Sequence, residues 1–252
     1  MIVYGRNPVA EALRGRRGNR IGEVWATAAV AREPFLQGLR TGARKGARTR
    51  IASAAEIERR CGSPAHQGVC ADAGAYPYAG AGELLATPNP LLVALDQLQD
   101  PQNVGSICRT AECVGAAGVV IAERRAAEVT AAVCKASAGA VEHLPVARAR
   151  NIADFLVDAR RAGCWCYGAV APGAPAARPP VRYDRPDYAG AGVVLVLGSE
   201  GSGLRPRVAK ACDELIALPL RGRVESLGVG AAAAALLYEI LQSRRDALDN
   251  GP

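Results

Sequence analysis

The sequence LVLGSEGSGLRPR, at residues 195–207, leads from a short apolar run through a turn of three glycines to a basic segment. Glycine-rich turns after strands often bind phosphates, because their backbone N–H groups can approach an anion closely. This turn lacks the Lys-Ser/Thr pair of a P-loop and the GxGxxG spacing of a dinucleotide site. Its carboxylate, Glu200, would repel a phosphate. The turn therefore favours a neutral or cationic ligand, or an arginine partner for Glu200; the alternative is a structural turn in which Glu200 caps the following backbone.

The turn is part of a longer alternation of apolar runs and helical patterns over residues 91–252. Strands are expected at residues 91–96, 117–122, 143–147, 164–170, 192–198 and 214–220, and helices at residues 104–114, 130–138, 151–163, 204–212 and in a final segment through Gln242. Strands that are apolar along their whole length are buried on both faces. The pattern predicts an α/β fold with a mostly parallel sheet that helices cover on both sides. A proline-rich loop at residues 172–190 is long enough to be functional or mobile.

Residues 1–75 form a second, smaller alternation. A helix is expected to begin with Asn7 as its N-cap, and Ser53 starts a capping-box match before a helix that ends near Gly62. Strands are expected at residues 21–28, 48–52 and 66–73, with a basic helix at about residues 33–45. This pattern predicts a small α/β domain. Residues 76–90 combine Pro, Gly and small residues without periodicity, which is typical of a linker.

The composition is that of a folded protein, because 50% of the 252 residues are hydrophobic and 22% are charged. No signal peptide and no apolar run of about 20 residues is visible, so a cytoplasmic protein is expected. The eight cysteines are scattered. Their spacing disfavours a disulfide framework or a zinc site and favours reduced, mostly buried thiols.

The net charge of +7 is concentrated at the front of the chain. Residues 1–90 hold 13 Lys and Arg against 7 Asp and Glu, whereas the remainder holds 18 against 17. Such asymmetry is typical of a protein with a polyanionic partner, most often a nucleic acid. A solvated basic face without a partner is the alternative.

Two further loops are expected at the carboxyl ends of strands, where open α/β sheets bind ligands. Asn103 stands where a helix is expected to begin, and Arg109 lies about 200° around that helix from the inward-facing Ile107. An arginine in this place can clamp a phosphate or a substrate, although a solvated surface arginine is the alternative. In the other loop, Ser226 precedes a run of Gly and Ala that allows close approach of a ligand, or simply close helix packing.

Together the three loops resemble the SpoU family of RNA ribose 2′-O-methyltransferases, within the SPOUT superfamily. The first motif is similar to DPQNVGSICRTA at residues 100–111, the second to LGSEGSGL at residues 197–204, and the third to LP at residues 218–219, VESL at residues 224–227 and the alanine-rich helix to residue 239. Three ordered motifs at these separations are a specific signal. Residues 1–75, with GRNPVAEAL and HQGV, resemble the small substrate-binding domain of rRNA-modifying members, so that the resemblance covers nearly the whole chain.

The resemblance implies a C-terminal deep trefoil knot that binds S-adenosylmethionine, in a homodimer whose active sites lie at the subunit interface. Residues 91–252 would be the methyltransferase domain and residues 1–75 the RNA substrate-binding domain, with 23S rRNA of the large subunit as the expected substrate. The catalytic residues would be Asn103, Arg109, Glu200 and Ser226, and the cofactor contacts Gly198, Leu218 and Leu227, with no metal. Arg109 would orient the RNA phosphate and stabilise the developing oxyanion, while Asn103 and Glu200 hold its guanidinium.

The third motif departs from the family pattern. The family usually has Ser-Leu-Asn-Val-Ser where this chain has Ser226-Leu227-Gly228-Val229-Gly230, so that an amide and a hydroxyl are missing and the backbone is freer. Two functions are therefore weighed. One is an S-adenosylmethionine-dependent rRNA ribose methyltransferase, of the housekeeping or the antibiotic-resistance type. The other is a non-catalytic RNA-binding or ribosome-assembly factor that retains the fold. A dehydrogenase is disfavoured because the dinucleotide fingerprint is absent.

Overall fold

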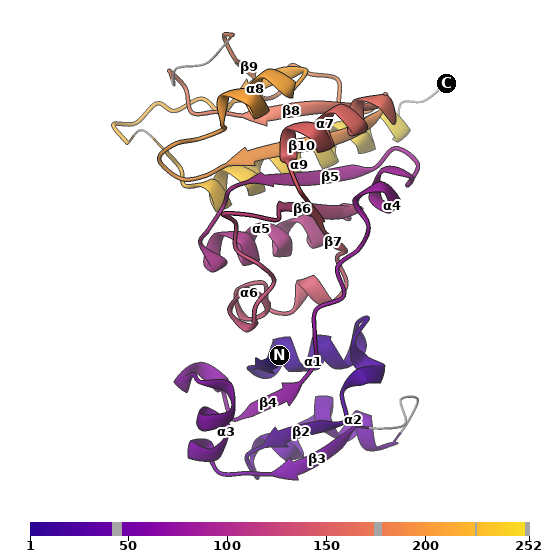
Figure 1. The fold of residues 1–252 in the computed structure, drawn as a ribbon, viewed down its shortest axis with the longest axis vertical. Helices are drawn as coiled ribbons and strands as arrows, with labels where there is room; N and C mark the ends of the chain where they lie inside the picture. The colour runs from indigo at the N-terminus through magenta and orange to yellow at the C-terminus, as the bar shows by residue number, and fades with distance from the viewer. Residues whose placement is uncertain (42–46, 174–177, 225, 250–252) are drawn as a thin grey trace. The chain divides into compact units, whose positions relative to one another are not determined.

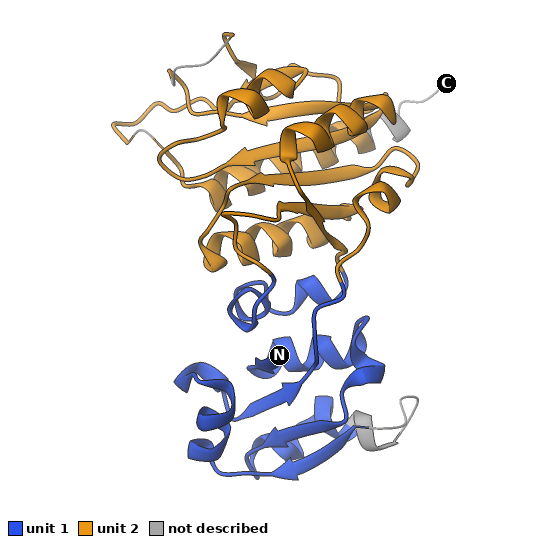
Figure 2. Ribbon diagram, viewed as in Figure 1, with its two compact units in different colours: residues 1–77, 129–143 blue, residues 78–128, 144–252 orange. Residues whose placement is uncertain are grey.

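The computed structural model describes residues 1–41, 47–173, 178–224 and 226–249. The chain divides into two compact units, coloured separately in Figure 2. Unit 1 comprises residues 1–77 and 129–143, and unit 2 comprises residues 78–128 and 144–252. Within the described ranges, no helix is both long and apolar enough to span a membrane.

Unit 2 is built on a seven-stranded sheet in the order β7-β6-β5-β10-β8-β11-β9 (Figure 1). Its strands are β5 Leu91–Asp96, β6 Gly118–Ala122, β7 Val146–Ala149, β8 Cys164–Ala169, β9 Val181–Arg182, β10 Gly192–Gly198 and β11 Glu214–Ala217. All neighbouring strands pair in parallel, which confirms the predicted fold class. The short strand β9 was not predicted. It lies in the proline-rich loop, where two residues are too few to give a sequence pattern.

Helices cover both faces of this sheet: α4 Ala81–Leu85, α5 Pro101–Cys113, α7 Ile152–Arg161, α8 Pro206–Ala211 and α9 Val229–Asp249. Alternate residues of a strand point to opposite faces. On one face, Leu92 and Val194 belong to a core cluster with buried side chains of α7 and α8. Helices α5 and α9 contribute nothing to that cluster; they pack against each other and against β6 and β10. The predicted linker, residues 76–90, is thus partly helical, because it contains α4.

The carboxyl ends of four strands share one edge of this sheet. Asp96, the last residue of β5, is in register with Gly198, the last residue of β10. On the other side of β10, the end of β8 is in register with Ile216 of β11. The segments that follow β5, β10 and β11 therefore leave the sheet at the same edge, as is usual for ligand-binding loops of parallel sheets.

Unit 1 contains a four-stranded sheet in the order β1-β4-β2-β3. Its elements are β1 Ile2–Tyr4, β2 Glu23–Ala26, β3 Arg48–Ile51, β4 Val69–Asp72, α1 Arg6–Arg14, α2 Pro34–Thr41, α3 Ala54–Cys61 and α6 Ala131–Ala136, with short 3-10 helices at Gly18–Arg20, Val30–Arg32, Pro64–His66 and Ala140–Glu142. The cap of α3 is confirmed, since Ser53 Oγ accepts a hydrogen bond of 3.2 Å from the Glu56 N–H. The predicted cap of α1 is wrong. Gly5, at φ 95°, is the N-cap in place of Asn7, because the chain turns into α1 directly after β1. Residues 42–45 of the predicted basic helix lie outside the described residues.

Residues 129–143 pack within unit 1 although both of their neighbouring strands in the sequence belong to unit 2. Arg17 and Glu142, 0% and 1% exposed, form an ion pair in which Nε donates to Oε2 over 2.9 Å and Nη2 donates to Oε1. Arg17 also donates to Cys134 Sγ over 3.5 Å and lies 5.4 Å from the ring centre of Tyr76. Burial acts to lower the pKa of Arg17, but the hydrogen bond and the attraction to Glu142 outweigh it and raise that pKa overall. The arginine is therefore a buried, fully paired cation.

Candidate active site

The glycine-rich turn after β10 is a tight hairpin. Ser199 and Gly203 exchange two backbone hydrogen bonds of 3.2 and 2.9 Å, and the hydroxyls of Ser199 and Ser202 lie 2.6 Å apart. Gly201 and Gly203 have φ angles of 85° and 64°, which favour glycine. A Cβ at Gly198 would lie 2.5 Å from the Leu204 nitrogen and collide with the Gly203 carbonyl. These glycines therefore let one part of the chain pass closely against another, and the turn does not open into a phosphate cradle.

An ion pair that the sequence did not suggest fixes the far side of this turn. Asp96 is buried at the carboxyl end of β5, where its Oδ2 accepts from the Arg205 N–H over 3.0 Å and its Oδ1 accepts from Arg205 Nε over 2.7 Å. The two residues stand 109 positions apart, so no local pattern connects them. The available signal was a single carboxylate at the end of an otherwise apolar strand, because such a group needs a partner when it is buried.

Helix α5 carries Asn103 and Arg109. The helix begins earlier than predicted, since Asp100 is its N-cap and accepts a hydrogen bond of 3.0 Å from the Gln102 N–H. Asn103 thus lies in the first turn, half-buried, and Arg109 lies further along, exposed. Arg109 and Glu200, which is also exposed, form no ion pair in the described part of the chain. Their expected pairing stays a prediction.

The third motif brings the other two together. A Cβ at Gly228 would lie 3.8 Å from Glu200 Oε1, and one at Gly230 would lie 3.8 Å from Asn103 Oδ1. Gly228 has a φ angle of 76°, a conformation that side chains rarely adopt. Asn103, Glu200 and the start of α9 therefore meet at the carboxyl edge of the sheet, although they are widely separated in sequence.

The remaining predicted site residues border the same loops. Ser226 is exposed, and its Oγ accepts a hydrogen bond of 3.0 Å from the Gly228 N–H. Leu218 follows β11 directly and is half-buried. Leu227 is a large apolar side chain, yet 52% of it is exposed to solvent. An exposed leucine at a candidate site can pack against an uncharged apolar group of a ligand.

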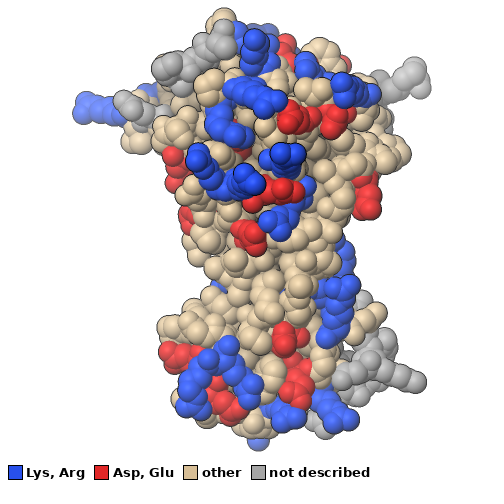
Figure 3. Space-filling view, in the orientation of Figure 1, with Lys and Arg blue, Asp and Glu red and all other residues tan. Residues whose placement is uncertain are grey.

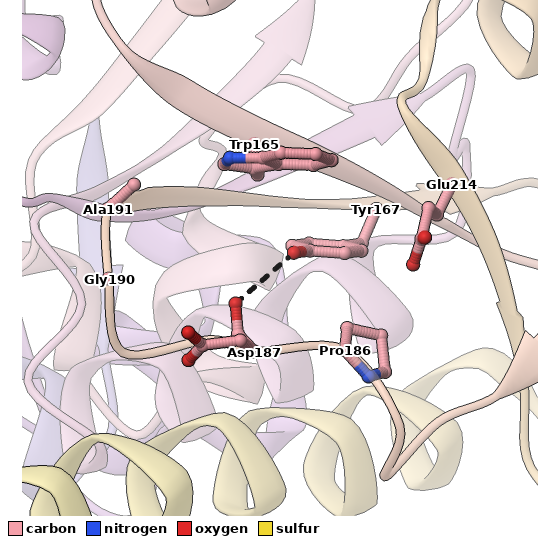
Figure 4. Close-up of a pocket in the computed structure, with 7 residues that line it drawn as sticks. All are labelled: Trp165, Tyr167, Pro186, Asp187, Gly190, Ala191 and Glu214. Atoms are coloured by element: carbon pink, nitrogen blue, oxygen red, sulfur yellow. Dashed lines mark hydrogen bonds between the residues drawn. The ribbon is translucent and has the colours of Figure 1, made fainter.

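A hollow of about 290 Å³ lies elsewhere on unit 2 and is not part of this site (Figure 4). It is lined by Trp165, Tyr167, Pro186, Asp187, Gly190, Ala191 and Glu214. Burial raises the pKa of Tyr167 to about 12, and its hydroxyl donates to the Asp187 carbonyl over 3.4 Å. Trp165 is the second residue of β8, Ala191 directly precedes β10 and Glu214 begins β11, so the hollow lies towards the amino ends of these strands. The three motif segments lie at their carboxyl ends.

Comparison with known proteins accounts for both parts of the chain. Residues 90–238 match the SpoU rRNA Methylase family, and residues 2–79 match the family described as RNA 2'-O ribose methyltransferase substrate binding. YacO of Bacillus subtilis (strain 168), named as a TrmH family tRNA/rRNA methyltransferase, is 36% identical over 96% of this chain and 95% of its own length. A TrmH family tRNA/rRNA methyltransferase of Staphylococcus haemolyticus is 32% identical over 99% of this chain and 98% of its own length.

Among solved structures, an rRNA methyltransferase from Sinorhizobium meliloti with bound AdoMet superposes with a TM-score of 0.75 at 27% identity. The match covers 97% of this chain and 87% of that one. Nearly the whole chain thus has a counterpart in known proteins. The chain belongs to the SpoU rRNA methylase family and is an RNA methyltransferase of the SpoU/TrmH type.

Proposed function

We propose that this protein transfers a methyl group from S-adenosylmethionine to a ribose 2′-hydroxyl of RNA, in the cytoplasm, with 23S rRNA as the substrate. The observation that carries the proposal is the meeting of Asn103, Glu200 and the start of α9 at one edge of the sheet. The match of residues 2–79 to a substrate-binding domain of RNA 2'-O ribose methyltransferases supports the ribose hydroxyl as the acceptor.

The loops at this edge fit S-adenosylmethionine. Gly198 has no room for a side chain, so only its backbone is available to a ligand, and Leu218 and Leu227 offer apolar side chains on the loop that follows β11. Such a mixture of apolar side chains and backbone polar groups is typical of sites for uncharged rings. When it is bound, the cofactor supplies a methyl group on a positively charged sulfur. Gly198, Leu218 and Leu227 would hold it.

Arg109 would orient the RNA and stabilise the negative charge that develops on the ribose oxygen. Methyl transfer from a sulfonium needs an oxygen brought into line and a stabilised developing alkoxide, which are effects of positioning and electrostatics. The planar fork of the Arg109 guanidinium suits it to anchoring a phosphate through two parallel hydrogen bonds. Asn103, in the first turn of the same helix, and Glu200 would hold it when RNA is bound, and Ser226 completes the site.

Unit 1 would bind the RNA. The match of residues 2–79 to the substrate-binding family supports this role for the predicted RNA-binding domain, residues 1–75, which the predicted linker at residues 76–90 would join to the rest of the chain. Arg48, which is exposed on β3, suits a contact with a phosphate, whereas the neighbouring exposed Arg50 is paired with Glu23 over 2.6 Å. Figure 3 displays Lys and Arg side chains interspersed with Asp and Glu on unit 2 as well, and the methyltransferase domain, residues 91–252, would bind the RNA around the reacting nucleotide.

The protein would act as a homodimer with a knotted methyltransferase domain. Tyr238, on α9, is 53% exposed, and Leu227 is exposed at the neighbouring loop. Large apolar side chains that stay exposed in a single chain are typical of surfaces that a partner covers. Covering them with a second copy would bring that copy close to the proposed cofactor loops.

Two measurements test the proposal. Isothermal calorimetry with S-adenosylmethionine is expected to give a binding signal, and total RNA from cells that lack the gene is expected to accept tritiated methyl groups at ribose. Mapping of ribose methylation in those cells then identifies the nucleotide. Absence of heat at millimolar cofactor, together with absence of label in RNA, would favour the alternative of an RNA-binding or ribosome-assembly factor, to which Gly228 and Gly230 point.

A further inference from the structure

Ser106 occupies the position between Asn103 and Arg109 on the surface of α5. Residues three apart on a helix are about 60° apart around its axis, so Asn103, Ser106 and Arg109 form one stripe. Asn103 is half-buried, and Ser106 and Arg109 are exposed, whereas Val104, Ile107 and their neighbours on the opposite side are buried. A hydroxyl therefore stands next to Arg109, the residue that the proposed function assigns to RNA, and between it and Asn103.

The Ser106 hydroxyl lies close to the place that a side chain on residue 230 would occupy. A Cβ at Gly230 would be 3.2 Å from Ser106 Oγ and 3.7 Å from Ser106 Cβ. The same Cβ would be 3.8 Å from Asn103 Oδ1. A hydroxyl on residue 106 and a hydroxyl on residue 230 would therefore lie in the same small region of the site. This position has glycine where the family pattern has serine.

No partner occupies the Ser106 hydroxyl in the described residues. The carbonyl of Ser106 accepts a hydrogen bond of 3.2 Å from Thr110 Oγ1, but its own Oγ makes none. A serine in a helix commonly bonds back to the preceding turn, and this one does not. Its donor and its two acceptor sites are available to a ligand that reaches α5.

We propose that Ser106 supplies the hydroxyl that residue 230 lacks, and that it hydrogen-bonds the RNA backbone at the methylated nucleotide. The inference rests on the proposed function, because it assumes that RNA lies along the stripe from Asn103 to Arg109. Ser106 is neutral and positions the substrate, while the positive charge of Arg109 stabilises the negative charge that develops on the ribose oxygen. On this proposal, the hydroxyl that the family pattern carries on α9 is carried on α5 in this chain.

A hydroxyl swap tests this assignment. The variants are Ser106→Ala, Ser106→Thr, Gly230→Ser and the double variant S106A/G230S, with Ser243→Ala as the matched control. Ser243 lies on α9, 13 residues or about 20 Å beyond Gly230, and also loses only a hydroxyl. Methyl transfer is measured with tritiated S-adenosylmethionine and total RNA from cells lacking the gene, together with cofactor binding by calorimetry and thermal unfolding.

Loss of one neutral hydrogen bond is expected to lower kcat/KM for RNA about three- to tenfold in Ser106→Ala, mainly through KM, with unchanged cofactor affinity. Ser106→Thr and Ser243→Ala are expected to stay within about twofold of the native protein. Gly230→Ser alone crowds Ser106, because 3.2 Å is a tight contact, and is expected to gain nothing. In S106A/G230S the alanine leaves room, and activity is expected to return.

Two results would overturn the inference while leaving the proposed function in place: an active native protein with a fully active Ser106→Ala, or a double variant no better than Ser106→Ala. A native protein that binds no cofactor and methylates no RNA would instead overturn the proposed function, and this inference with it.

Discussion

Replacing Glu142 by glutamine tests whether residues 129–143 fold with unit 1. The substitution removes the charge that balances Arg17 at a site where both side chains are almost wholly buried. Breaking a buried ion pair from one side costs about 3–5 kcal/mol, because the remaining ion stays desolvated without its partner. Since the glutamine side chain keeps one oxygen that can accept a hydrogen bond, we expect a loss at the lower end of this range, about 3 kcal/mol in the free energy of unfolding.

The two tryptophans of the chain report on the two units separately. Trp25 lies in β2 of unit 1, and Trp165 lies in β8 of unit 2. In a Trp165→Phe background, urea unfolding followed by fluorescence monitors unit 1 alone. At an m-value of about 1.5 kcal/mol/M, Glu142→Gln should lower the midpoint by about 2 M.

In a Trp25→Phe background, the transition of unit 2 should shift much less. A large shift of the Trp165 signal with an unmoved Trp25 signal would refute the assignment of residues 129–143 to unit 1. The double variant R17M/E142L is the control for charge. It replaces the pair by apolar side chains of similar length and should recover most of the stability, because neither ion is then left buried alone.

Three further predictions concern the site and the thiols. Gly198→Ala should lower the free energy of unfolding by about 1–3 kcal/mol and abolish cofactor binding measured by calorimetry, because the new Cβ would collide with the backbone of Gly203 and Leu204. Unchanged cofactor binding would contradict the close approach of Gly198 to that backbone. Arg109→Lys should lower methyl transfer at least about tenfold, because an ammonium cannot replace the planar fork of a guanidinium, and near-native transfer to total RNA would rule out that role. In native protein at pH 8, Cys113 should be the fastest thiol towards Ellman's reagent, because it is exposed while Cys61 is partly buried and the other six cysteines are buried. Burial raises the pKa of Cys134 to about 11 and that of Cys212 to about 12, and a fast phase unaffected by Cys113→Ser would contradict the prediction.

The sheet of unit 2 could be predicted from the sequence because its strands β5, β6 and β10 are buried throughout and apolar along nearly their whole length. That pattern arises from burial on both faces and needs no knowledge of partners. The two-residue strand β9 and the five-residue helix α4 could not be found, because neither is long enough to repeat a pattern. Gly5 was overlooked as the cap of α1, since a glycine cap has no side chain to recognise.

The candidate site was predictable only in part. Resemblance singled out Asn103, Glu200 and the segment around Gly228, and the structure brings these together. It could not give the pairing of Asp96 with Arg205 or the place of Ser106 beside Gly230, because both depend on contacts between segments about a hundred residues apart. Glu200 and Arg109 are both exposed and form no ion pair within the described residues, so their pairing stays a prediction.

The buried pair of Arg17 and Glu142 also limits how this protein can exchange parts with its relatives. Recombination that replaced residues 1–77 alone would separate the arginine from the carboxylate that balances it. A compatible exchange would have to carry residues 129–143 along, from the middle of the other unit's sequence. The two units therefore cannot be exchanged between relatives independently of each other. Within this lineage, substitutions at Arg17 and at Glu142 should have occurred together.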